Sequence, residues 1–163
     1  MIGRERLQTG AAVRGWSITT LKRGLLLAWA LWFGIVFLTN ACDALKALGV
    51  LSHDWSFASG NYDFIAKTTA IYHLPAWADG VLFGGVIVWE GACTLLFVRA
   101  FLVTGQKWGV AGPVLDAFVA STALWVAFIL ADEIFVAYQI EATHREIFTS
   151  LLATLIALVI LPD

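Results

Sequence analysis

The chain has 163 residues, of which 60% are hydrophobic and 13% are charged, and its formal net charge is −2. Soluble domains carry about 25% charged residues, so this composition is that of a bilayer protein. The weak negative charge provides no basic surface for nucleic acid. The two cysteines, Cys42 and Cys93, are too few for a disulfide framework or a tetrahedral zinc site. They could form a disulfide only if the helices bring them together, and we expect them to act as small apolar residues.

The N-terminal part of the chain is basic and is followed by the first apolar span. Residues 1–20 are expected to lie along the inner leaflet as an amphipathic segment or to form a flexible tail. The span, at about residues 25–48, resembles a lipoprotein signal peptide because a basic start and an apolar run precede Cys42. Asn40 stands where such a signal needs a small residue, so we expect a retained helix.

An aromatic-rich segment, residues 51–79, separates the first span from the second. We expect it to form an interfacial layer that caps the bundle on the outer side. Within it, residues 63–74 are predicted to form a short helix that ends at Pro75. The aromatic residues of this layer are Trp55, Phe57, Tyr62, Phe64, Tyr72 and Trp77.

Three further apolar spans follow, at about residues 81–103, 111–138 and 147–162. A hydrocarbon core of about 30 Å takes roughly 20 residues per helix, so the chain is predicted to be one all-α domain over residues 21–163 with four transmembrane helices. The links after the second and third spans are short, which favours antiparallel neighbours. The polar stretch 141–146 is predicted to be an exposed turn. The excess of Lys and Arg on one side predicts that both termini are cytoplasmic.

Polar side chains inside the spans need an explanation, because an ionised group at the bilayer centre costs roughly 2.5–3.5 kcal/mol. Glu90 lies near the middle of the second span, while Asn40 and Asp43 share one face of the first. Asp132 and Glu133 occupy a similar depth on the third span and point about 100° apart. We expect these five residues to gather in the outer half, either as a proton, cation or quinone site or as hydrogen-bonding partners that hold the helices together.

Other patterns indicate packing or weak ligand sites. Gly80, Gly84 and Gly91 on the second span are typical of close helix approach. Glu141 and His144 form half of the Glu-x-x-His pattern of di-metal bundles, and no metal is expected there because the second copy is absent. A b-type haem between His73 and His144 requires that the two rings face each other at the outer edge. Arg145 is expected to be an outer-side cation that reaches back toward the acids of the third span.

The order of these features resembles a bacterial family of predicted small integral membrane proteins, domain-of-unknown-function family 2165. The resemblance covers about residues 20–163 and implies four helices but no established reaction. Lys67 and Ile71-Tyr72 stand where the family tends to have His and Met-Asp. The matching elements are Asn40 and Asp43, NYDF at 61–64, Glu90, DEIF at 132–135, Arg145 and the terminal LPD.

No glycine-rich phosphate loop, nucleophile elbow or Cys-x-x-Cys pair occurs in the sequence, so we do not expect an enzyme. The leading hypothesis is a non-catalytic accessory or anchoring subunit of a larger assembly in the bacterial cytoplasmic membrane, such as an electron-transfer complex. It would contact lipid and either other membrane subunits or a second copy, without a cofactor. One alternative is a redox subunit that binds haem b or quinone in its outer half. The other is a small proton- or cation-coupled transporter that uses Glu90.

Overall fold

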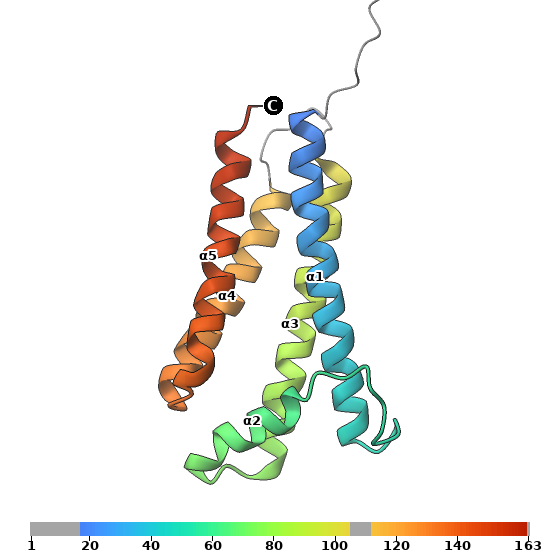
Figure 1. Ribbon diagram of the computed structural model, residues 1–163, viewed down its shortest axis with the longest axis vertical. Coiled ribbons are helices and arrows are strands. Elements are labelled where there is room, and N and C mark those ends of the chain that lie inside the picture. The colour runs from blue at the N-terminus through green and yellow to red at the C-terminus, as the bar shows by residue number, and fades with distance from the viewer. Residues whose placement is uncertain (1–16, 105–111, 163) are drawn as a thin grey trace, which may run out of the picture.

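The computed structural model describes residues 17–104 and 112–162, and within them it is all-helical. Four helices are long and apolar enough to cross a membrane, which confirms the predicted all-α bundle and defines a multi-pass membrane protein. Figure 1 shows them running side by side in alternating directions. Their bounds are Ile18–Ala47 (α1), Ala76–Val103 (α3), Pro113–Ile134 (α4) and Tyr138–Ile160 (α5). The prediction for residues 1–16 lies outside the described part of the chain.

The ends of the helices follow local signals. α1 begins after Ser17, whose side chain accepts a hydrogen bond from the backbone N–H of Thr20 at 3.1 Å. α4 begins with Pro113, whose fixed φ suits the first helical turn.

The α4–α5 connection differs from the sequence prediction. α4 ends at Ile134 rather than near residue 138, and the chain reverses through Val136, whose φ is +56°. α5 therefore begins at Tyr138, and the predicted turn at 141–146 is wrong, because these residues form the first turns of α5. Glu, Ala and Arg are good helix formers, and Arg145 pairs with Glu141 one turn away on the same helix at 3.0 Å.

The four long helices pack in chain order, with α1 against α3, α3 against α4 and α4 against α5. We describe them as two pairs, α1 with α3 and α4 with α5, because these separate toward one end of the bundle (Figure 1). The pairs meet through an aromatic core in which Phe33 of α1 stacks on Phe97 of α3, and Phe97 meets Phe118 of α4 edge-on. Toward the end of the bundle where α3 begins and α4 ends, the two pairs diverge (Figure 1). α5 lies at the edge of the bundle, with only Leu151 and Leu158 fully buried among its described residues.

A short helix crosses the end of the bundle where the pairs diverge, and we call this end the α2 end (Figure 1). α2 spans Asn61–Thr69 and continues as a 3₁₀ turn, η1, over Ala70–Tyr72. The predicted helix at 63–74 corresponds to these two elements. The chain leaves the helical conformation at His73, whose φ is +51°, before Pro75 is reached.

Candidate functional site

A chain of side-chain hydrogen bonds connects the α2 end to the interior of the α1–α3 pair. Asn61 of α2 donates to Oδ1 of Asn40 at 2.8 Å. The Asn40 amide in turn donates to both carboxyl oxygens of Glu90, at 2.9 and 2.8 Å. Asn40 and Glu90 are buried, whereas Asn61 is exposed. The carboxyl group of Glu90 thus lies between helices with two hydrogen-bond contacts, as a buried polar group requires.

Asp43, one turn further along α1, holds the start of α2. Its Oδ2 accepts a hydrogen bond from the backbone N–H of Tyr62 at 2.8 Å and from the hydroxyl of Ser59 at 3.2 Å. The residue before α2 is Gly60, which has no side chain to cap the helix. A carboxylate from another helix therefore supplies the missing acceptor and favours the positive end of the helix dipole. Asp43 and Asn40 of α1 together fasten α2 to the bundle.

A second polar group lies on the α4–α5 pair. Nδ1 of His144 is 2.6 Å from Oδ2 of Asp132, and the Asp132 side chain is almost completely buried. The His144 ring stacks on Phe128, with 5.0 Å between the ring centres, and lies 5.5 Å from the ring of Trp125. A carboxylate thus orients an imidazole against an aromatic wall, an arrangement that fixes which ring nitrogen faces outward.

Trp125 is the one described residue with a buried side-chain donor that has no partner. Its ring also lies 5.8 Å from Trp32 of α1, so it separates His144 from the aromatic core. Buried polar groups are nearly always hydrogen-bonded, so an unpaired indole N–H beside an imidazole calls for an explanation.

The structure therefore divides the five polar residues singled out from the sequence. Asn40, Asp43 and Glu90 belong to the α1–α3 pair, whereas Asp132 pairs with His144 and Glu133 is exposed. Sequence reasoning missed the Asp132–His144 contact because the residues are twelve positions apart. They meet because the chain turns at 135–137, a segment without glycine or proline to mark it.

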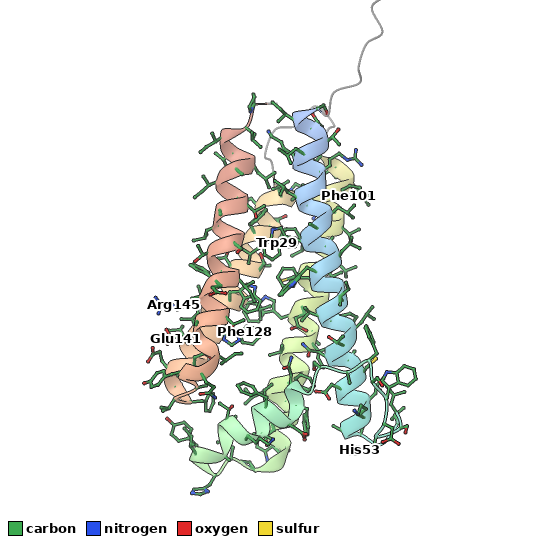
Figure 2. The ribbon with its side chains drawn as sticks, viewed as in Figure 1. Trp29, His53, Phe101, Phe128, Glu141 and Arg145 are labelled. Atoms are coloured by element: carbon green, nitrogen blue, oxygen red, sulfur yellow. The ribbon has the colours of Figure 1, made fainter. Side chains whose placement is uncertain are left out.

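Arg145 and Glu141 lie on the outward face of α5, next to the face that carries His144. Arg145 was expected to reach the acids of the third span, but it pairs with Glu141 of its own helix. Figure 2 shows both side chains projecting away from the other helices. The contact with the third span comes from His144 instead, since His144 lies on the inward face of α5.

The two histidines singled out from the sequence lie in different surroundings. His73 is exposed at the end of η1, whereas Nδ1 of His144 contacts the Asp132 carboxyl group. A Cβ on Gly80 or Gly84 meets nothing within 4 Å, whereas one on Gly91 lies 3.1 Å from the Phe37 ring. Close helix approach is thus found at Gly91. Cys42 and Cys93 are free.

Over residues 17–104 and 112–162 no group of three or more His, Cys, Asp or Glu side chains is arranged to hold a metal ion. Comparison of the chain with family models, curated proteins and solved structures found no match. The fold defines a four-helix, multi-pass membrane protein. The resemblance to the family of predicted small integral membrane proteins stays a prediction.

Proposed function

We propose that the protein is a non-catalytic accessory subunit of a larger assembly in the bacterial cytoplasmic membrane. The observation that carries the proposal is the outward face of α5, a membrane-spanning helix that presents charge and hydroxyl groups where lipid would otherwise lie. A shallow hollow runs along this face, lined by Tyr138, Glu141, Ala142, Arg145, Glu146, Thr149 and Ser150.

The polar part of this face reaches well into the span. At a rise of 1.5 Å per residue, Arg145 lies about 10 Å and Ser150 about 18 Å from the start of α5 at Tyr138. The Arg145 side chain is 66% exposed. Charged side chains in membrane spans almost always face protein or water rather than lipid, because lipid offers them no hydrogen-bond partners. This supports a protein partner that covers the face.

Small residues on the same face favour a close helix partner. Thr149 and Ala153 are exposed, and Ala157 continues their line at four-residue spacing. The Thr149 hydroxyl bonds to the backbone carbonyl of Arg145 at 2.8 Å and does not project. Small residues four apart allow two transmembrane helices to approach closely. The expected partner is a transmembrane helix that brings a donor or basic side chain to the depth of Glu146.

The test is purification of the tagged full chain in a mild detergent, with the companion subunits identified and quantified. Ala153→Phe fills the small-residue face and is expected to abolish co-purification of the companions. Ala92→Phe is the matched control, because Ala92 is exposed on α3 between the exposed apolar residues Val88 and Leu95.

The proposal requires that the control variant keep the companions that Ala153→Phe loses. A wild-type protein that is strictly monomeric and without companions contradicts it. So does an Ala153→Phe variant that folds normally and retains the full set of companions.

A further inference from the structure

The outward face of α5 carries one line of exposed residues that continues along most of the helix. Its members recur at alternating spacings of four and three residues: Ala142, Glu146, Thr149, Ala153, Ile156 and Ile160. This is the spacing with which one helix of a left-handed pair contacts the next, and most transmembrane helix pairs have this geometry. We call this line the α5 seam. Its spacing suits a second helix that packs along it.

The hollow on α5 lies on this seam at the depth of Glu146. In a parallel helix pair with this spacing, each seam side chain inserts between four residues of the facing helix. For the side chain at position 146 of a parallel neighbour with the same sequence, those four are residues that line the hollow: Ala142, Arg145, Glu146 and Thr149. The hollow is formed by one helix and is open, whereas small-molecule sites enclose most of their ligand. It therefore suits a side chain of a neighbouring helix better than a small ligand.

The charges around the hollow complement each other between two copies of the chain. Glu146 is exposed and forms no ion pair within residues 17–104 and 112–162. Arg145 bonds to Glu141 through Nη1 at 3.0 Å, and its side chain is 66% exposed. A guanidinium group has five N–H donors, so Arg145 has donors left for a second carboxylate. The partner that Glu146 lacks is a cation at its own depth, and Arg145 lies one residue away.

We propose that the helix covering this face is α5 of a second copy of the chain, packed in parallel, with Arg145 of each copy paired to Glu146 of the other. Two copies in one membrane have the same orientation, so a twofold axis along the membrane normal places equal residue numbers at equal depth. The hollow of each copy then receives Glu146 of the other. This inference rests on the proposed function for its premise that protein covers this face. The companions then assemble on the pair, so a change at Ala153 also releases them.

The experiment links two copies directly through the seam. Ala153→Cys places a thiol on it, and oxidation of isolated membranes joins two copies only where their Cα atoms approach to roughly 4.4–6.8 Å. Copies of the full chain with two different affinity tags are co-expressed, and the disulfide-linked dimer that carries both tags is quantified on non-reducing gels. Ala92→Cys is the matched control, since Ala92 is also exposed but lies on α3. The wild type controls for linkage through Cys42 and Cys93.

Charge variants in the Ala153→Cys background test the pairing. Arg145→Glu and Glu146→Arg should each lower the dimer yield at least about tenfold when all copies carry the same change, because like charges then face each other. Co-expression of one variant with the other restores two pairs of opposite charge, so the yield should return to within about twofold of that without a charge change. Arg99→Glu reverses the charge of an exposed residue on α3 and should leave the yield unchanged.

A dimer yield for Ala153→Cys no higher than that for Ala92→Cys overturns the inference. So does a yield from the two co-expressed charge variants that does not exceed the yield from either alone. If companions still co-purify with the wild type, such a result leaves the proposed function standing and shows that the covering helix belongs to another protein. A seam dimer that purifies without companions has the opposite meaning, since it supports this inference and contradicts the proposed function.

Discussion

Replacing Asn40 with Ala tests whether the Asn61–Asn40–Glu90 chain holds the bundle together. In the wild type the Asn40 amide makes two contacts with the Glu90 carboxyl group, at 2.9 and 2.8 Å, in a site that leaves Asn40 only 1% exposed. The variant removes this donor and leaves a buried acceptor unpaired. Such a loss costs about 1–3 kcal/mol, and more for a charged group. We expect Asn40→Ala to lower the free energy of unfolding by about 3 kcal/mol.

Two further variants separate the hydrogen bonds from simple truncation. Asn61→Ala also breaks the chain, but Glu90 keeps its donor, so the loss should stay below about 1 kcal/mol. Replacing both buried partners with apolar residues, Asn40→Leu with Glu90→Met, leaves no buried polar group without a partner, because the Asn61 amide that loses Asn40 Oδ1 is exposed. The double variant should therefore be more stable than Asn40→Ala, because removing both partners can be nearly neutral.

The assay is reversible unfolding in mixed micelles of dodecyl maltoside and sodium dodecyl sulfate, followed by far-ultraviolet circular dichroism. A loss for Asn40→Ala no larger than that for Asn61→Ala would refute the reasoning. It would mean that Glu90 finds another donor or that its hydrogen bonds contribute little.

Two other predictions concern α2 and the α1–α3 contact. Asp43→Ala removes the acceptor of the Tyr62 N–H and should destabilise α2 by about 1 kcal/mol. The expected result is faster amide hydrogen exchange over residues 61–69 and unchanged exchange in α4. Equal exchange rates over residues 61–69 in the variant and the wild type contradict the capping role. Gly91→Leu, whose Cβ would lie 3.1 Å from the Phe37 ring, should lower the free energy of unfolding by about 1–3 kcal/mol in the same micelle assay. Gly84→Ala should be neutral or raise it by up to about 1 kcal/mol. A larger loss for Gly84→Ala than for Gly91→Leu would show that Gly91 is not the close contact.

The sequence by itself determined the environment of the protein and its main elements. Apolar runs of about 20 residues are a local property, and each one predicts a membrane helix without reference to its neighbours. The short helix before Pro75 was also visible, because a polar start, an amphipathic stretch and a proline follow one another. The predicted C-terminal end of the third span and the predicted start of the fourth were wrong, since the reversal at Val136 has no glycine or proline signal.

Only the tertiary structure decided which polar groups meet. Whether Asp43 caps α2, and whether Glu90 finds Asn40, depends on the rotation and vertical offset of whole helices, and neither is encoded in a single span. The same holds for His144, which faces Asp132 while its neighbour Arg145 points away from the bundle. A turn of about 100° between adjacent residues separates a buried contact from an exposed one, and packing between helices sets that rotation.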